Sequence, residues 1–366
     1  MNCRFCNFKL DNVFLDLVNS PASNSYLTKK ELDEPEIFYP LKIYTCNKCK
    51  LVQVDEYKKS DDIFDKEYAY FSSYSTSWLE HAKKYVEKIT DRLSLDCNSL
   101  VTEVASNDGY LLQYFKEKNI ACIGIEPTSS TAKVAREKGI EVIEDFFGTT
   151  LAKNLKKSDL ILGNNVLAHV PNINDFVKGL KIGLKENGTI TMEFPHLLNI
   201  IKENQFDTIY HEHFSYLSLY TVKQIFEKQG LKIYDVEELS THGRSLRIYA
   251  THKENTILKI TNNIDNILNK EKAFGLLDIN IYKNFQKKAD KVKYDLINFL
   301  INAKQNDKKV IAYGAAAKGN TLLNYSGIKN DLIEFVIDKS PHKQGKYLPA
   351  SHIPIVNEDK IKEFKP

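Results

Sequence analysis

The segment Tyr210–Phe214, Tyr-His-Glu-His-Phe, is the part of the chain best suited to acid/base chemistry. Two imidazoles, a carboxylate and a phenol lie close together here, and burying them is costly unless they are used or fully hydrogen-bonded. A neutral imidazole can accept a proton near neutral pH. In a regular strand Tyr210 and His213 would face opposite sides, whereas a turn or helix brings them to the same side. We therefore expect a bend here, with a polar surface loop as the alternative.

Two Cys-x-x-Cys pairs, Cys3/Cys6 and Cys46/Cys49, have the spacing of metal-binding knuckles. The short spacing within each pair lets both of its sulfurs face one ion. Four thiolates fill the tetrahedral coordination of zinc and leave no open position for a reactant. We therefore predict a structural zinc site rather than a catalytic one.

Length and composition indicate a globular protein with more than one domain. A chain of 366 residues predicts two or three domains, and 42% hydrophobic with 27% charged residues is close to globular averages. A net charge of +3 does not suggest the concentrated basic face of a nucleic-acid binder. The sequence has no membrane-spanning run and no signal peptide, so we expect a cytoplasmic protein with reduced cysteines. Cys97 and Cys122 are expected to be small buried hydrophobes.

The segments that must position these groups alternate between strand and helix in the middle of the chain. Strand-like runs are predicted at 100–105, 121–125, 160–164 and 189–194, with helices at 110–118, 130–138 and 175–184. Such alternation predicts an α/β fold with a parallel sheet, covered on both faces, that binds ligands beyond the carboxyl ends of its strands.

The two ends of the chain have a different character. Short strand-like pieces at 13–17, 41–45 and 51–54 have little apolar material, so zinc would supply folding energy that their core cannot. The stretch 264–305 is expected to be a bridging helix or a helical hairpin, and strands at 310–313 and 333–337 indicate a smaller α/β unit. We divide the chain into a zinc module (1–60), a helical and aromatic connector (61–98), an α/β core (99–250), and a linker with a C-terminal α/β domain (251–366).

Polar residues after successive strands indicate a nucleotide cofactor. Glu103–Gly109 follows the first strand of the core, although it lacks the usual Gly-x-Gly pattern. Glu126 ends the second strand about 20 residues further on, where a carboxylate can accept both ribose hydroxyls. Asp145 and Phe146 offer a carboxylate and an aromatic face to a purine. Ordinary turns between strands are the alternative interpretation.

The third strand of the core runs into Asn164, Asn165 and His169. A lone histidine after an apolar run is more often a satisfied core residue than a catalyst. Both interpretations of His169 therefore remain open from this pattern alone.

Ten motifs occur in order along nearly the whole chain. They are the cysteine knuckles, EYAYFSSYS, EVASNDGYLL, GIEPT, NNVLAHVPNINDF, TMEFPHL, YHEHFSYLS, HGRSLRIY, YGAAAKGNTLLNY and KQGKYLPASHIPI. Together they resemble the sugar C-methyltransferase family, whose members transfer a methyl group from S-adenosylmethionine to a carbon of a nucleotide-linked 4-keto-6-deoxy sugar. The resemblance implies a zinc module, a class I (Rossmann-like) methyltransferase core and a C-terminal Rossmann-like domain.

The resemblance also implies catalytic roles. A carbon next to a ketone becomes nucleophilic only after it loses a proton, so a base and a donor to the enolate oxygen are needed. His213 is implied as the base, and Tyr210 and Glu212 would orient it or the sugar. His169 and Asn165 would donate to the enolate oxygen. Tyr70, from the aromatic patch, is implied in the same pocket.

Binding roles follow from the same motifs. The resemblance implies contacts to the cofactor from Glu103, Ser106, Asn107, Asp108, Gly109, Glu126, Asp145, Phe146 and Asn164. It implies substrate contacts from Tyr74, His242, Arg244 and Lys318. Lys318 lies at a predicted helix N-terminus, where a cation can hold a diphosphate.

Two departures from the family pattern affect the substrate site. Arg244 stands where the family usually has glycine in His-Gly-Gly-Ser, and family members usually continue beyond the point where this chain stops at Pro366. Either the chain ends early or its last domain is incomplete.

We expect a monomeric enzyme of deoxysugar and polysaccharide or capsule biosynthesis. Its substrate would carry dTDP, GDP or CDP and be methylated at carbon 3, without nucleic-acid or membrane partners. The alternatives are a zinc-ribbon RNA methyltransferase and a non-catalytic nucleotide-binding scaffold.

Overall fold

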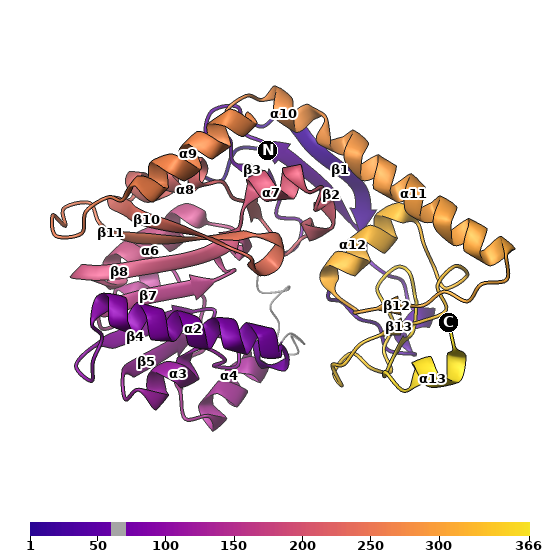
Figure 1. Cartoon of the computed structure of the whole chain (residues 1–366), viewed down its shortest axis with the longest axis horizontal. Coiled ribbons are helices and arrows are strands. Elements are labelled where there is room, and N and C mark those ends of the chain that lie inside the picture. The colour runs from indigo at the N-terminus through magenta and orange to yellow at the C-terminus, as the bar shows by residue number, and fades with distance from the viewer. Residues whose placement is uncertain (60–70) are drawn as a thin grey trace.

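The computed structural model describes residues 1–59 and 71–366, and Figure 1 shows how its parts are arranged. An α/β core lies on the left and a smaller C-terminal unit on the right. The N-terminal strands lie between them, beneath an arch of three helices. No helix in the described part of the chain combines the length and apolar character needed to cross a membrane.

The core is built on a seven-stranded sheet in the order β10-β11-β8-β7-β4-β5-β6. β11 runs in the opposite direction to the other six strands, so the predicted parallel sheet is confirmed apart from this strand. The strands are β4 (Leu100–Val104), β5 (Ala121–Ile125), β6 (Glu141–Ile143), β7 (Ser158–Asn164), β8 (Leu184–Pro195), β10 (Leu231–Leu239) and β11 (Ser245–His252).

Helices cover both faces of this sheet because side chains alternate along each buried strand. On β7, Leu160 and Leu162 pack with α2 and α3, whereas Ile161 packs with α6 and α8. The helices of the core are α2 (Thr76–Leu93), α3 (Leu112–Glu117), α4 (Ser129–Glu137), α5 (Thr149–Ala152), α6 (Ile173–Gly183), α7 (Leu197–Lys202) and α8 (Leu219–Lys228). The helices predicted at 110–118, 130–138 and 175–184 correspond to α3, α4 and α6.

The N-terminal strands form a second, antiparallel sheet that includes a strand from the core. Its order is β1 (Asn12–Ser20), β2 (Tyr39–Thr45), β3 (Val52–Val54) and β9 (Ser215–Tyr216). β9 directly follows the histidine cluster, and its Ser215 pairs with Gln53 of β3. The zinc module is therefore joined to the core through the segment that carries the candidate catalytic residues.

Three helices form the arch, and the last two of them pack against apolar side chains of the N-terminal strands. They are α9 (Asn262–Phe274), α10 (Asn280–Lys283) and α11 (Phe285–Gln305), so the linker is neither one helix nor a simple hairpin. Gly275 ends α9 in the left-handed region at φ +97°. Phe14 of β1 stacks on Phe285 of α11, with ring centroids 4.7 Å apart.

The C-terminal unit is a small parallel sheet with its own apolar core. It contains β12 (Ala312–Tyr313), β13 (Val336–Ile337), β14 (Ile355–Val356), α12 (Ala317–Ser326) and α13 (Lys360–Phe364). The predicted smaller α/β unit is confirmed, although its strands are shorter than expected.

Short 3-10 turns lie at Glu31–Asp33, Ser72–Tyr74, Leu167–His169, Phe206–Thr208 and Thr241–Gly243. The expectation that Cys97 is buried is wrong, because its side chain is exposed, and Cys122 is partly buried. Cys97 lies in the loop before β4 rather than on the apolar strand itself.

Glu271 ties the arch to the core. Its Oε1 lies 2.7 Å from His196 Nε2 and accepts from the Leu219 backbone N–H at 2.6 Å, and its Oε2 accepts from the Tyr220 N–H at 2.9 Å. All these groups meet at the N-terminus of α8, where a carboxylate is favourable.

Replacing Glu271 with alanine should lower the free energy of unfolding by about 3–5 kcal/mol, because it leaves buried backbone donors without a partner. Glu271→Gln keeps the shape and one acceptor, so it should cost less. Urea denaturation followed by circular dichroism measures both. An alanine variant as stable as the wild type would contradict this account.

Candidate active site

A cavity of about 580 Å³ lies at the carboxyl ends of the central strands. Residues at the carboxyl ends of β4, β5 and β7 line it, among them Asn107, Glu126 and Asn164. Asn24 of the N-terminal module and Lys343 of the C-terminal unit also line it. All three parts of the chain therefore contribute to one site, at the sheet edge where α/β folds bind ligands.

The turn after β4 takes its shape without the usual glycines. Ala105 and Asn107 have φ values of +57° and +50°, the left-handed conformation that glycine favours. Gly109 at φ +71° has no room for a side chain, because a Cβ there would lie 2.4 Å from Ile140 Cδ1. A tight turn therefore forms here although the Gly-x-Gly pattern is absent.

Five of the nine predicted cofactor residues line the cavity: Asn107, Glu126, Asp145, Phe146 and Asn164. The other four lie in β4 and its turn: Glu103, Ser106, Asp108 and Gly109. Glu103 is fully buried, and burial raises the pKa of its carboxyl well above the ordinary value. These four residues shape the turn rather than line the cavity.

Glu126 and Phe146 are cavity-lining residues that could hold a nucleotide cofactor. The Glu126 carboxylate accepts from the backbone N–H groups of Asn107 at 2.8 Å and Thr128 at 3.0 Å, which fixes its position. Burial raises the pKa of Glu126, while these hydrogen bonds act in the opposite direction. Phe146 is 41% exposed although it lines the cavity, so its ring presents an apolar surface there.

The histidine cluster forms the predicted bend. Residues 211–212 are a turn, and the backbone N–H of His213 donates to the Tyr210 carbonyl at 3.0 Å. Tyr210 and His213 therefore lie on the same side, with the Tyr210 hydroxyl 2.9 Å from His213 Nε2. The bend is confirmed, and the surface loop is excluded because residues 211–213 are buried.

Two hydrogen bonds determine the protonation of the neutral His213 ring. Nδ1 lies 2.8 Å from the Thr208 carbonyl oxygen, which can only accept, so Nδ1 carries the proton. Nε2 is then the basic nitrogen, and the Tyr210 hydroxyl donates to it. His213 and Tyr210 both line the cavity.

His169 lies edge-on beside His213, with ring centroids 4.6 Å apart. Burial lowers the pKa of His169 to about 4, so its imidazole is neutral at physiological pH. Asn165 precedes it in the same loop with φ +58°, and its backbone N–H donates to the Glu193 carbonyl at 2.8 Å. Asn165 and His169 both line the cavity.

The remaining polar groups of the cluster have partners in the N-terminal module. Asn24 Nδ2 lies 2.8 and 2.9 Å from the two carboxylate oxygens of Glu212. His211 does not line the cavity; its Nε2 lies 3.2 Å from the Pro40 carbonyl, and burial lowers its pKa. Asn24 was not predicted, because no local pattern marks a residue that meets its partner 188 positions away.

The predicted substrate residues are spread more widely. Lys318 lines the cavity at the start of α12, together with Lys343, which was not predicted. The Tyr74 hydroxyl pairs with His342 Nε2 at 3.0 Å, and the exposed Arg244 pairs with Glu203 at 3.2 Å. Neither Tyr74 nor Arg244 lines the cavity.

His242 and Tyr70 are the remaining predicted site residues. His242 belongs to the turn Thr241–Gly243 that precedes β11. Tyr70 lies outside the described residues, so its predicted role stays a prediction.

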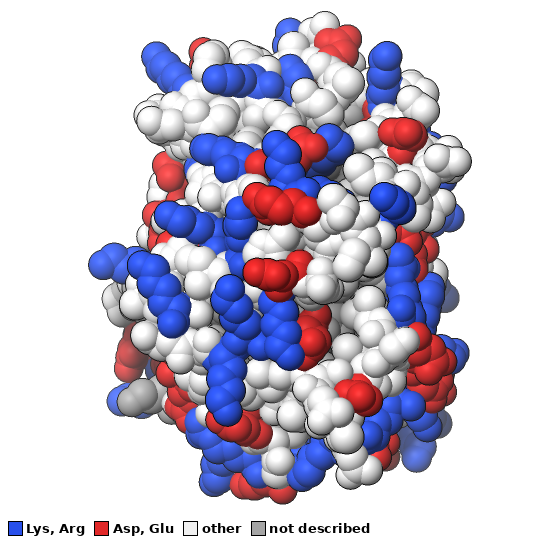
Figure 2. Space-filling model, turned by 90° about the vertical axis from the view of Figure 1, so that its left-hand side faces the viewer, with Lys and Arg blue, Asp and Glu red and all other residues white. Residues whose placement is uncertain are grey.

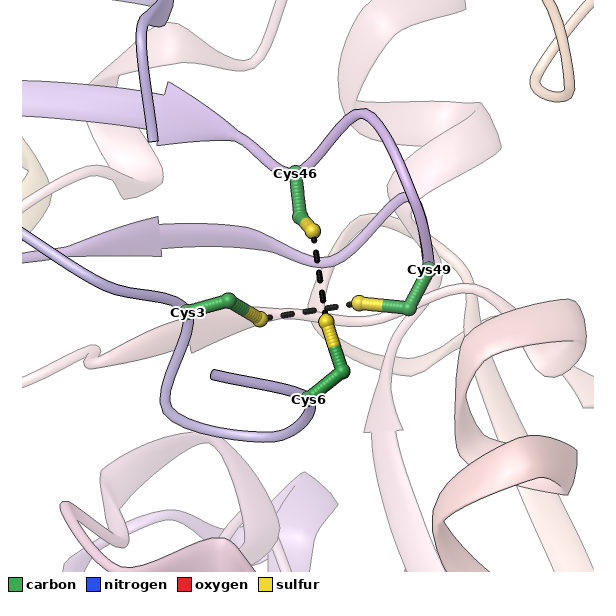
Figure 3. Close-up of side chains that lie close together, drawn as sticks. All are labelled: Cys3, Cys6, Cys46 and Cys49. Carbon is green, nitrogen blue, oxygen red and sulfur yellow. Dashed lines mark hydrogen bonds between the residues drawn. The ribbon is translucent and has the colours of Figure 1, made fainter. Parts of the chain in front are cut away.

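The four cysteines of the knuckles converge, as Figure 3 shows. The Cys3 and Cys49 sulfurs are 3.6 Å apart, those of Cys6 and Cys46 are 3.5 Å apart, and all four lie within 4.8 Å of one another. Zinc–sulfur bonds of about 2.3 Å in a tetrahedron require sulfurs roughly 3.8 Å apart, so the cluster fits zinc. A thiol must lose its proton to become a zinc ligand, so metal binding at this cluster displaces protons.

Comparisons with known proteins find matches along most of the chain. Three family models match: a zinc binding domain over residues 3–64, a methyltransferase domain over 78–236 and a C-methyltransferase C-terminal domain over 240–366. The chain is 31% identical over 360 residues to C-methyltransferase NovU of Streptomyces niveus, an alignment that covers 96% of this chain and 84% of that protein.

Solved structures are similar only in part. Magnesium protoporphyrin IX methyltransferase of Synechocystis PCC 6803 is 14% identical, with 48% of this chain and 83% of that chain covered and a TM-score of 0.40. PH0226 protein of Pyrococcus horikoshii OT3 is also 14% identical, with coverages of 50% and 95% and a TM-score of 0.42.

The sheet, the cavity and the matching methyltransferase domain define a class I methyltransferase that uses S-adenosylmethionine. The four-cysteine cluster and the matching zinc binding domain identify its N-terminal part as a structural zinc module. With its similarity to NovU extending over most of both proteins, the chain belongs to the C-methyltransferase family.

Loss of the metal should destabilise the whole protein, because the cysteine cluster packs into the same apolar core as β8 and α8. Cys46→Ser should abolish stoichiometric zinc and lower the thermal unfolding midpoint by roughly 10 °C. The exposed Cys97→Ser is the matched control and should change neither quantity. Metal analysis and thermal denaturation measure the two effects. Full zinc content in Cys46→Ser would refute the four-thiolate site.

His169 should make stability depend on pH. Its pKa is about 4 in the folded protein against an ordinary 6.5, so between these values the unfolded chain binds a proton that the folded chain does not. Stability is therefore lost as pH falls, by about 2 kcal/mol between about pH 7.5 and pH 5. Urea unfolding at both pH values should show a smaller loss for His169→Gln. Equal losses would contradict the lowered pKa.

Proposed function

We propose that the protein methylates the carbon next to the ketone of a nucleotide-linked 4-keto-6-deoxy sugar, at carbon 3. The observation that carries this proposal is the fixed tautomer of His213, whose basic Nε2 belongs to a ring that lines the cavity. Methylation of oxygen or nitrogen can use a lone pair that already exists, whereas methylation of carbon needs a base to create the nucleophile.

In this mechanism His213 Nε2 takes the proton from the sugar carbon. The electrons of the broken C–H bond form the enolate, whose negative charge lies on the former ketone oxygen. The Tyr210 hydroxyl, which donates to Nε2 in the free protein, must release it when the sugar enters. When bound, S-adenosylmethionine would supply the electrophilic methyl group for the enolate carbon, and the electrons of the C–S bond would remain on its sulfur.

His169 and Asn165 are the proposed donors to the enolate oxygen. Both belong to the loop that lines the cavity after β7. The lowered pKa of His169 matters here because a neutral neighbour allows His213 to become positively charged without repulsion. The carboxylate of Glu212, which accepts a hydrogen bond from Asn24, would favour the protonated form of the His213 ring.

Binding roles complete the proposal. Glu126 would accept from the ribose of the cofactor, and Phe146 with Asp145 would contact its adenine. Lys318, which also lines the cavity, would bind the diphosphate of a dTDP-, GDP- or CDP-sugar. We expect the enzyme to act as a cytoplasmic monomer in deoxysugar and polysaccharide or capsule biosynthesis.

RNA methylation has less support. The net charge is +3, and the described side chains on the face drawn in Figure 2 mix basic and acidic groups rather than form one basic band. RNA binding usually relies on a positively charged groove that follows the backbone.

His213→Gln should abolish proton abstraction while leaving cofactor binding within about twofold of the wild type, because a glutamine amide is not a base. The measurement is the uptake of solvent deuterium by a 4-keto nucleotide sugar, with S-adenosylhomocysteine in the cofactor site. Wild-type protein should catalyse this uptake, and the variant should lose it by at least about a hundredfold. A variant as active as the wild type would show that His213 is not the base.

A further inference from the structure

Arg4 lies between two predicted zinc ligands, Cys3 and Cys6, and its guanidinium contacts residues outside the knuckle. One terminal nitrogen of its guanidinium donates to the Pro171 carbonyl at 2.8 Å, and the other donates to the Val54 carbonyl. The guanidinium carbon lies 5.2 Å from the centre of the Phe214 ring. The side chain is thus held by two hydrogen bonds and a cation–π contact.

The partners of Arg4 belong to the two loops that carry the candidate catalytic histidines. Pro171 is two residues beyond His169, and Phe214 directly follows His213. Val54 connects the same loop to the zinc module, because its backbone N–H donates to the Phe214 carbonyl at 3.2 Å. One planar group therefore contacts the His169 loop, the His213 loop and strand β3.

The backbone around Arg4 is fixed from the metal side. Gln53 accepts from the Arg4 N–H at 2.9 Å through Oε1, and its Nε2 donates to the Cys3 sulfur at 3.2 Å. The same Gln53 pairs in the sheet with Ser215, just after the histidine cluster. A group that hydrogen-bonds to a metal ligand orients that ligand. Gln53 does this for Cys3 and also pairs with the segment that follows His213.

The geometry of these contacts explains why an arginine suits this position. Arginine presents several N–H groups in a rigid plane, so it can bind two carbonyls in different directions at once. Lysine offers a single flexible ammonium group and cannot reproduce both contacts with the same geometry.

We propose that Arg4 is a positioning residue for methyl transfer, which sets the spacing between the His169 and His213 loops and fixes both to the zinc site. This inference rests on the proposed function of those histidines. It gives the zinc module a role beyond folding, because the knuckle that holds the metal also holds the two catalytic loops together.

Lys228 provides a matched control on the same knuckle. Its Nζ donates to the Phe5 carbonyl at 3.1 Å and lies 5.1 Å from the centre of the Phe5 ring. It approaches from α8. Lys228→Met therefore removes a cation from the knuckle without removing a contact to the His169 or His213 loop.

The test compares Arg4→Met, Arg4→Lys and Lys228→Met in the full zinc-loaded chain. Hydrogen–deuterium exchange of backbone amides, read by mass spectrometry, needs no substrate. Arg4→Met should speed exchange in segments 165–172 and 208–216 by at least about tenfold, with one zinc per chain retained. Arg4→Lys should show a smaller increase, and Lys228→Met should leave both segments unchanged.

Turnover provides the second readout. Arg4→Met should lower kcat about 10- to 100-fold, with the Kd for S-adenosylmethionine unchanged within about twofold, because the cofactor end of the cavity is not affected. Arg4→Lys should have a kcat between those of Arg4→Met and the wild type. If Arg4→Met does not fold, the test is the comparison of Arg4→Lys with Lys228→Met and the wild type. Lys228→Met should keep the kcat of the wild type.

The outcomes separate this inference from the proposed function. Unchanged exchange in both segments, or equal effects of Arg4→Met and Lys228→Met, would overturn the role of Arg4 whatever the substrate is. If the wild type fails to methylate any keto sugar while exchange responds as predicted, the proposed substrate is wrong, but Arg4 still holds the loops.

Discussion

The ring of His213 is held at both nitrogens, and the rest of the active site depends on this constraint. Thr208 in one turn and Tyr210 in the next hold Nδ1 and Nε2 at 2.8 and 2.9 Å. These partners meet only because the chain bends before β9 begins. β9 then pairs with β3 of the zinc module, so the metal site, the bend and the base form one continuous structure.

Much of this arrangement could be predicted from the sequence, because the signals are local. Cysteine spacing indicates a four-sulfur site, strand and helix periods indicate the α/β core, and the polar cluster at Tyr210–Phe214 predicts a bend. Each signal depends on residues within a few positions of one another, where backbone geometry restricts the outcome. The cavity-lining positions Glu126 and Phe146 also follow from the rule that ligands bind where parallel strands end.

Contacts between distant segments could not be predicted in this way. Asn24 meets Glu212, and Arg4 meets Pro171, across more than a hundred residues without any periodic pattern to indicate it. The left-handed backbone conformation of Ala105 could not be predicted either, because glycine rather than alanine usually takes this conformation. The N-terminal strands were expected to rely on zinc for stability, yet α10 and α11 cover one of their faces.

We propose that this member of the C-methyltransferase family alkylates a carbon next to a ketone. Incubation with S-adenosylmethionine labelled with carbon-13 in the methyl group, with 4-keto nucleotide sugars and RNA offered in parallel, tests this proposal. We expect heteronuclear NMR of the sugar product to show the labelled methyl bonded to a ring carbon beside the carbonyl. Label bonded to oxygen or nitrogen, or found in the RNA, would contradict it.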